Sequence, residues 1–201
     1  VPPAESKVRV AAQAVARNLP IRGNGRVGVS MAGGVHVERN LTFANNAKLN
    51  IAPRGKVTVD GLINGVDKST PSLVIQSDAE GSGSLINETS GINARVERYV
   101  PGSSSDWHMV ASPVAGQQFN SRFDNDFTAG ALFVWYEPLQ SWVKFGSNQW
   151  DEANNNSPNF VAGKGYMIAF CFDQQENNSN PTYFFDGELH TGKTSIPISN
   201  K

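Results

Sequence analysis

The stretch NAKLNIAPRGKVTVDGLIN, residues 46–64, decides the fold class of this chain. It consists of a short strand pattern, a turn that contains glycine, a second short strand pattern and a final Ile-Asn pair. Residues 71–87, PSLVIQSDAEGSGSLIN, repeat the same order. A repeat of twenty-odd residues made of short strands is typical of stacked coils, in which each coil buries its apolar side against the next. The stretch therefore predicts a β-solenoid.

Short segments of the same kind fill the first ninety residues. Most of them alternate apolar with polar residues, and Gly, Asn, Pro or Asp separates each from the next. They are VGVS (27–30), VHVE (35–38), NLTF (40–43), AKLNI (47–51), KVTV (56–59), LVIQS (73–77) and GSLI (83–86). We expect a short β-solenoid-like region over residues 1–90, and an antiparallel sandwich with short strands is the alternative. Residues 8–19 fit a strand or a helix, and a strand is favoured because Pro20 and a Gly-Asn-Gly turn follow.

The pattern changes near residue 93, where the strand-like segments become longer and more aromatic. They are NARVERYV (93–100), DWHMVASPV (106–114), GALFVWYEP (130–138), SWVKFGS (141–147), KGYMIAFCF (164–172), PTYFFDGEL (181–189) and KTSIPIS (193–199). Seven strands joined by turns suit two sheets, so we expect an antiparallel β-sandwich over residues 91–201. The polar loop QWDEANNNSP (149–158) is expected to be mobile. The fold class is thus all-β throughout.

Composition and charge narrow the classes of partner. The net charge is −1, the isoelectric point is about 6.3 and 17% of the residues are charged, so nothing indicates nucleic acid or an anionic membrane. No apolar run is long enough to span a bilayer, and no membrane insertion is expected. The lone Cys171 cannot form an internal disulfide, and the apolar run around it indicates a buried thiol. The N-terminal VPPAESK contains no signal peptide and is typical of a mature or trimmed terminus.

Residues 187–194, GELHTGKT, match the phosphate-binding pattern G-x-x-x-x-G-K-[ST]. A P-loop needs a helix that begins at the lysine and directs its N-terminal dipole at the phosphate. The residues that follow, SIPIS, alternate like a strand, and Pro197 would break a helix in its first turns. We therefore interpret the match as the turn of a β-hairpin rather than as a nucleotide site.

Aromatic residues are the strongest lead to a binding site. In the segment SWVKF (141–145), strand alternation places Trp142 and Lys144 on one face and the residues between them on the other. Because Lys144 favours water, Trp142 is expected on the outer face, and Trp150 follows in the polar loop. Exposed indoles stack on sugar rings or anchor protein contacts, so the candidate ligand-binding residues are Trp142, Lys144 and Trp150. The alternative is that Trp142 covers a cross-strand neighbour and Trp150 caps the end of the sandwich.

No catalytic residue and no cofactor are expected. The three histidines lie far apart in the sequence, without the spacing of metal ligands. Asp106, Asp124 and Asp126 offer hard oxygen ligands to calcium, but their spacing lacks the ligand count of a known calcium loop. Calcium bound by these three residues is the alternative to the absence of a metal.

The order of several pieces resembles a known module. GKVTVDGLIN, LVIQSDAEGSGSLI, ARVERYVPG, WHMVASPVAGQ, LFVWYEPLQSWVKF, FVAGKGYMIAF and the FDGELHTG hairpin follow one another over roughly residues 45–195. This series resembles a module of secreted and cell-surface proteins of the Bacteroidota, many of them exported by the type IX route and described as adhesin-like or hypothetical. The resemblance implies a β-helix-like piece followed by a β-sandwich, an extracellular or cell-surface location and no catalytic residues. Such modules usually continue past the hairpin, so the sandwich is expected either whole or incomplete at its C-terminus.

These observations lead to a ranked set of functional hypotheses. The first is a non-enzymatic surface or structural module that mediates adhesion or assembly through protein or glycan contacts, including self-association through strand edges. The second is a carbohydrate-binding module that uses exposed aromatic residues and belongs to a larger glycan-processing protein. An enzyme of the β-helix type ranks third, because the solenoid is too short for a long catalytic groove.

Overall fold

The computed structural model describes residues 7–31, 33–44, 46–66, 72–100, 106–119, 132–169 and 182–192. The chain is all-β, and its first part is a solenoid of about four coils. It divides into two compact units. The first unit holds the described residues up to Tyr99 together with Phe184–Gly192, and the second holds those from Val100 to Tyr183.

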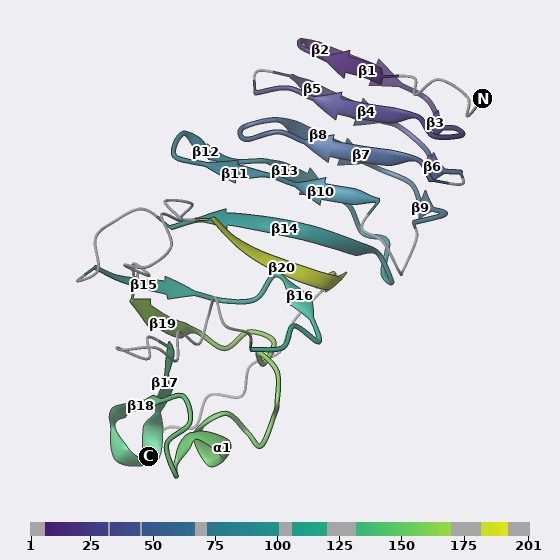
Figure 1. The fold of residues 1–201 in the computed structure, drawn as a ribbon. Helices are drawn as coiled ribbons and strands as arrows, with labels where there is room; N and C mark the ends of the chain where they lie inside the picture. The colour runs from purple at the N-terminus through teal and green to yellow at the C-terminus, as the bar shows by residue number, and fades with distance from the viewer. Residues whose placement is uncertain are drawn as a thin grey trace. The chain divides into compact units, whose positions relative to one another are not determined.

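Each of the first three coils contributes three short strands to the solenoid, which Figure 1 shows stacked on one another. These strands are β1 (Lys7–Val10), β2 (Gln13–Ala16) and β3 (Leu19–Ile21), then β4 (Arg26–Val29), β5 (Gly34–Val37) and β6 (Leu41–Phe43), then β7 (Lys48–Ile51), β8 (Lys56–Val59) and β9 (Ile63–Asn64). The fourth coil contains β10 (Leu73–Ile75), the small hairpin β11 (Ser77–Asp78) and β12 (Gly81–Ser82), and β13 (Ser84–Ile86). Residues 7–10 and 13–16 are thus strands, which confirms the strand interpretation of residues 8–19.

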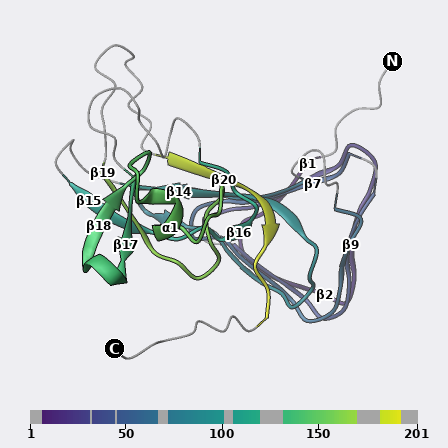
Figure 2. The same ribbon diagram turned by 90° about the horizontal axis from the view of Figure 1, so that it is seen from below.

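Equivalent strands of successive coils stack into three parallel sheets. Their orders are β1-β4-β7-β10, β2-β5-β8-β13 and β3-β6-β9, and the coils superimpose when the unit is viewed along the stack (Figure 2). Arg26 of one coil pairs with Lys48 of the next. Gly34 pairs with Lys56 at the same spacing of 22 residues. The repeat of twenty-odd residues that the sequence predicts is therefore one coil of the solenoid.

Columns of aliphatic side chains form the core of the solenoid. Val29, Ile51, Ile75 and Val96 are register partners in neighbouring strands, and all four are buried. Alternation along each strand directs every second side chain inward, so one residue per coil adds to the same column. Val8 begins the neighbouring column but is 57% exposed, because β1 is the outermost strand of its sheet among the described residues.

Two glycines allow the turns of adjacent coils to approach closely. A Cβ atom on Gly33 would lie 2.3 Å from the carbonyl oxygen of Val10, one coil away, and a Cβ on Gly55 would lie 2.9 Å from that of Val29. Contacts this short do not occur between a real Cβ and a backbone oxygen, so only glycine fits at these turns. The glycines between the short strands are therefore spacers between coils as well as turn residues.

Asparagine side chains connect the turns of successive coils. The Oδ1 of Asn18 accepts a hydrogen bond from the backbone N–H of Asn40, at 3.3 Å. The Oδ1 of Asn40 in turn accepts one from the backbone N–H of Leu62, at 3.0 Å. Each bond links residues 22 positions apart, so a donor that would lack a strand partner at the turn is satisfied by the neighbouring coil.

The solenoid sheet that contains β1 extends beyond the fourth coil. β14 (Asn93–Tyr99) pairs in parallel with β10, and β20 (Thr182–Leu189) follows β14 in the strand order. Arg95 donates two hydrogen bonds to the Asp186 carboxylate, at 2.8 and 2.7 Å. Its guanidinium also lies 5.2 Å from the ring centroid of Phe184. A segment late in the sequence is thereby attached to the solenoid.

This arrangement differs from the expected division at residues 90 and 91. β14 and most of β20 belong to the solenoid unit, although both segments were expected in the sandwich. The reason is pairing: β14 continues the parallel ladder of β10, and β20 lies between β14 and β16 in the order of the same sheet. Length and aromatic content distinguish these strands from the short ones, but they do not show which sheet a strand joins.

The second unit contains a four-stranded antiparallel sheet of order β15-β19-β17-β18. Its strands are β15 (Trp107–Val110), β17 (Leu132–Tyr136), β18 (Ser141–Lys144) and β19 (Tyr166–Ala169), and the unit also contains the two-residue strand β16 (Val114–Ala115). A 3-10 turn, η1 (Glu137–Leu139), joins β17 to β18, and a helical turn, α1 (Trp150–Ala153), follows β18. The described residues of this unit form this one four-stranded sheet. The second sheet that a β-sandwich requires is not seen among them.

No helix within the described residues is both long enough and apolar enough to cross a membrane.

Candidate functional site

Two tryptophans face each other on the outer face of the second unit's sheet. Trp135 of β17 lies directly opposite Trp142 of β18 in the antiparallel register. Their ring centroids are 5.6 Å apart and the ring planes are inclined by 70°. The indole N–H of Trp135 donates a hydrogen bond of 2.6 Å to the Glu137 carboxylate. This bond holds the Trp135 ring in one orientation, with its surface partly exposed to solvent.

The same face carries further apolar side chains on the other strands. Trp107 of β15 is 50% exposed and lies edge-on to Phe133 of β17, with ring centroids 5.3 Å apart. Met109 is 63% exposed and pairs with Met167 of β19, which pairs with Phe133 on its other side. We call the set Trp107, Met109, Phe133, Trp135 and Trp142 the aromatic face.

The opposite side of this sheet is a conventional core. The residues that alternate with the aromatic face are buried, namely Leu132, Val134, Val143, Tyr166 and Ile168. An exposed apolar surface on the solvent side of a sheet is unusual for a monomer and marks a surface that contacts something else. The aromatic face is therefore the first candidate site.

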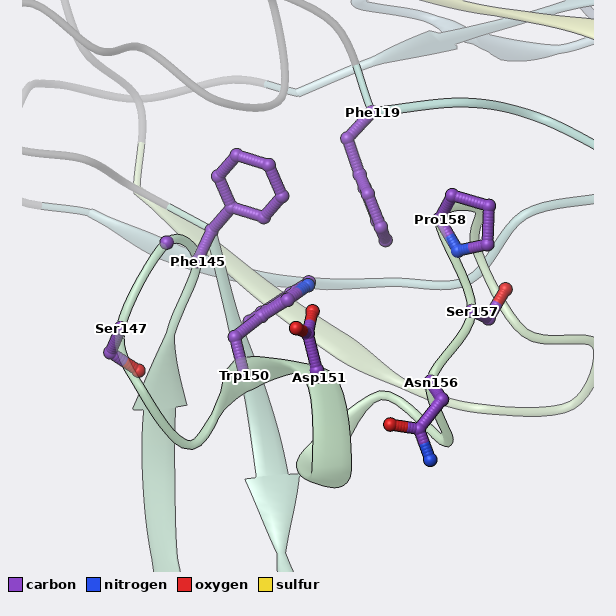
Figure 3. A pocket seen from close by; sticks show the side chains of 9 residues that line it. Phe119, Phe145, Ser147, Trp150, Asp151, Asn156, Ser157 and Pro158 are labelled. Atoms are coloured by element: carbon purple, nitrogen blue, oxygen red, sulfur yellow. The ribbon is translucent and has the colours of Figure 1, made fainter.

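A hollow of about 570 Å³ lies beside α1 and is the second candidate (Figure 3). Phe119, Phe145 and Trp150 form its apolar wall, with ring centroids near 5 Å apart and the Trp150 ring edge-on to the other two. Asp151 and Asn156 contribute polar side chains to the rim, with the Asp151 carboxylate on the same side as the Trp150 ring (Figure 3). An aromatic wall with a few polar groups is the usual composition of a small-ligand site.

A buried polar network supports the segment around this hollow. The hydroxyl of Tyr166 donates a hydrogen bond of 2.6 Å to the amide oxygen of Asn154 and accepts one of 2.9 Å from the backbone N–H of Val161. Burial raises the pKa of Tyr166 to about 12. The ammonium of Lys164 donates to the backbone carbonyl of Ala153, and burial lowers the pKa of Lys164.

A family model described as a domain of unknown function, DUF8693, matches residues 2–201. The chain belongs to this family. No curated protein and no solved structure matches the chain. The match covers nearly the whole sequence, so the DUF8693 model spans both the solenoid unit and the sheet unit.

In this DUF8693 chain, the site residues predicted from the sequence lie in different places. Trp142 and Lys144 lie on the outer face as alternation predicts, and Lys144 is opposite Phe133. Trp150 is 5% exposed, because α1 turns its ring into the aromatic cluster of Phe145 and Phe119. Of the two interpretations offered by the sequence, an exposed indole and a packed one, the structure has the packed one. Trp150 lines the hollow from within and is not brought onto the aromatic face.

The loop at residues 149–158 also differs from expectation. It contains α1, and Asn154 within it is fully buried. The Asn154 amide donates hydrogen bonds to the backbone carbonyls of Ser157 and Asn159, at 2.7 and 3.1 Å. The polar sequence therefore encodes a hydrogen-bonded turn around a buried amide rather than an open loop.

The remaining chemical candidates are not assembled into a site. Asp106 is exposed beside β15, and Asp124, Asp126 and Cys171 lie outside the described residues. Across the described part of the chain, no group of three or more His, Cys, Asp and Glu side chains is placed to hold a metal ion. His36 binds Asp60 at 2.7 Å on the solenoid surface.

The P-loop match at residues 187–194 does not form a phosphate loop. Gly187, Glu188 and Leu189 belong to strand β20, so the first positions of the motif are extended and cannot wrap around a phosphate. Strand β20 ends only at Leu189, and Gly192 has a positive φ of 78°. Lys193 and Thr194 lie outside the described residues.

Sequence reasoning missed Trp107, Met109 and Trp135. The signal was present, since strict alternation around Val134 places Phe133 and Trp135 on one face. The pairing of four strands from distant parts of the chain then gathers them into one surface, and the sequence does not show that pairing.

Proposed function

We propose that this chain is a non-enzymatic extracellular surface module that mediates adhesion or assembly through contacts with other proteins, including further copies of itself. The observation that carries the proposal is the aromatic face. Exposed Trp and Met side chains on a hydrogen-bonded sheet supply the apolar anchors that protein interfaces use most.

The geometry of the aromatic face favours a protein partner over a flat sugar chain. The two ring pairs are inclined by 70° and 74°, so neighbouring rings do not form one plane. A row of sugar rings needs coplanar platforms, whereas side chains of a protein can fill the steps between inclined rings. Lys144 at the margin adds a charged rim to the apolar centre.

Strand edges offer a second mode of assembly. β1, β2 and β3 are the outermost strands of their sheets among the described residues, and Val8 on β1 is exposed. An open parallel edge can accept a strand from another copy. The extracellular location and the completion of the second unit as a β-sandwich are part of the same proposal, and both rest on the resemblance to the secreted modules of the Bacteroidota.

Size-exclusion chromatography with light scattering over a concentration series tests the proposal. We expect multimers whose fraction rises with concentration and falls in the double variant Met109→Ser/Trp135→Ser. Leu139→Ser is the matched control, since Leu139 is also exposed but lies in the turn η1 and is not one of the five residues of the aromatic face. Multimers that persist in the double variant would place assembly at the strand edges, and a strictly monomeric wild type at high concentration would remove the assembly mode.

The hollow beside α1 favours a second candidate function, carbohydrate binding within a larger glycan-processing protein. Its aromatic wall and the polar rim of Asp151 and Asn156 fit one sugar unit. Glycan-array binding that is lost in Asp151→Asn or Asn156→Ala would support this candidate, with Trp142→Ala reporting separately on the aromatic face. Trp150→Ala is unsuitable as a test because Trp150 belongs to the core.

A further inference from the structure

The charges of the chain are divided unevenly along its length. Residues 1–66 contain nine of the 17 Lys and Arg residues and three of the 18 Asp and Glu residues. This stretch therefore has a formal charge of +6, and the rest of the chain has −7, which together give the net charge of −1. The near-neutral total hides a basic stretch over the first three coils and an acidic remainder, and such an asymmetry indicates an anionic partner for the basic part.

The outer face of one solenoid sheet gathers several of these basic groups. Val27 and Val29 of β4 point into the core, so Arg26 and Gly28 point outward by alternation. The register places Arg9 of β1 beside Gly28. Arg26 pairs with Lys48 of the next coil, also on the outside.

Gly28 forms the floor of a hollow of about 500 Å³ on this face. A Cβ atom on Gly28 would meet nothing closer than the carbonyl oxygen of Val8, at 4.0 Å, so the backbone does not require glycine here. The missing side chain opens the surface between neighbouring coils. Around this floor lie Arg9, Arg26, Met31, Asn50, Pro53 and Gln76.

We propose that this hollow binds a segment of an acidic polysaccharide, with the carboxylate or sulfate of one sugar held by Arg9. A guanidinium donates two parallel N–H groups to such an anion. The amides of Asn50 and Gln76 can donate to and accept from sugar hydroxyls. Met31 supplies apolar contact for the C–H face of a pyranose ring. An anionic sugar needs a positive charge, hydrogen-bonding amides and an apolar wall, and this concave surface has all three.

Nucleic acid shares the negative charge but fits the hollow less well. Proteins that hold single strands stack the bases on aromatic side chains. None of the described residues that line the hollow is aromatic. A charged sugar with hydroxyl groups therefore matches the lining better than a nucleotide does.

Calorimetric titration of the full chain with a defined oligogalacturonate, and with a sulfated oligosaccharide of equal charge, tests this site. Gly28→Val fills the floor without changing the charge, and Arg9→Gln removes one guanidinium from the rim. Each is expected to weaken binding of the better oligosaccharide by about tenfold or more, the loss typical of one charge-assisted contact. Arg17→Gln is the matched control, since it removes the same charge from the same coil at a position outside the hollow, and it should change affinity less than about twofold.

Three outcomes would overturn the proposal. The first is no binding of either oligosaccharide. The second is an equal loss in Arg9→Gln and Arg17→Gln, which would mean that only the overall charge attracts the ligand. The third is that single-stranded DNA of matched charge binds more tightly than either oligosaccharide, with an affinity that Gly28→Val does not change. If circular dichroism shows that Gly28→Val does not fold, the comparison of Arg9→Gln with Arg17→Gln tests the proposal instead. The proposal does not depend on the aromatic face, because all of its variants lie in the first unit.

Discussion

Asn154 shows how one residue organises the segment beside the hollow. It lies in the run Asn154–Asn156, whose members look alike in the sequence. Asn154 is buried with its amide fully bonded, whereas Asn155 and Asn156 are exposed and have positive φ values of 58° and 54°. A buried amide without partners would be costly, so the network with Tyr166 is what permits the polar sequence to fold inward.

Replacing Tyr166 by Phe is expected to destabilise the second unit. The change leaves the Asn154 amide oxygen buried without the hydroxyl that donates to it, and the backbone N–H of Val161 loses its acceptor. The expected loss in the free energy of unfolding is about 1–3 kcal/mol, measured by urea denaturation. Tyr136→Phe, at a less buried site on the same sheet, is the control and should have a smaller effect. Equal stability of Tyr166→Phe and wild type would show that the network contributes nothing.

The raised pKa of Tyr166 predicts a loss of stability at alkaline pH. An unfolded tyrosine ionises near pH 10, but folded Tyr166 ionises only near pH 12 because burial disfavours the phenolate. Between these values the unfolded state has released the proton and the folded state has not, so stability falls as the pH rises from 10 to 12. Urea midpoints measured across this range should decline, and Tyr166→Phe should reduce the slope. An unchanged slope in the variant would assign the decline to other groups.

At the scale of elements, the turns set the distance between coils, because each turn lies against the backbone of the coil before it. Gly33 and Gly28 lie five residues apart in the same coil, yet they serve opposite purposes. Gly33 lets a turn approach a backbone carbonyl, and Gly28 leaves a surface open. Both look the same in the sequence, because closeness to another coil is a property of the stack.

Gly33→Ala and Gly28→Ala should therefore differ in sign or size. In Gly33→Ala the new Cβ meets the Val10 carbonyl at 2.3 Å, and the coils must separate. We expect a loss of about 1–3 kcal/mol, as for an overpacked core. Gly28→Ala is the matched control and should be neutral or stabilise by up to about 1 kcal/mol, because its Cβ meets no clash and the unfolded chain loses freedom. Thermal unfolding followed by circular dichroism measures both, and equal effects would contradict the close approach at Gly33.

At the scale of the whole molecule, the chain passes between the two units more than once. The chain leaves the solenoid unit at Tyr99 and returns to it at Phe184. Each unit has its own buried core, one of aliphatic columns and one of aromatic rings under a sheet. All four tryptophans lie in the second unit, at positions 107, 135, 142 and 150.

This distribution of tryptophans predicts that two optical probes report different events. Tryptophan fluorescence follows the second unit alone, whereas far-ultraviolet circular dichroism follows the strands of both. Because the cores are separate, we expect the two urea transitions to have different midpoints. Coincident transitions by both probes would mean that the two units unfold as one cooperative body.

The sequence by itself determined the local features of this protein. Alternation, short strands and Gly or Asn turns predicted the coils of the solenoid, their period and the outer position of Trp142 and Lys144. These features depend on neighbours within a few residues, because strand alternation and turn geometry are set by the backbone nearby.

Only the tertiary structure decided the features that join distant residues. Arg95 meets Asp186 across 91 positions, which brings β20 into the solenoid. The aromatic cluster turns Trp150 inward, and the stacking of coils gathers basic side chains around Gly28. Each of these depends on which strands pair and which faces are covered, and pairing over long separations leaves no local signal because many alternative partners have the same alternating pattern.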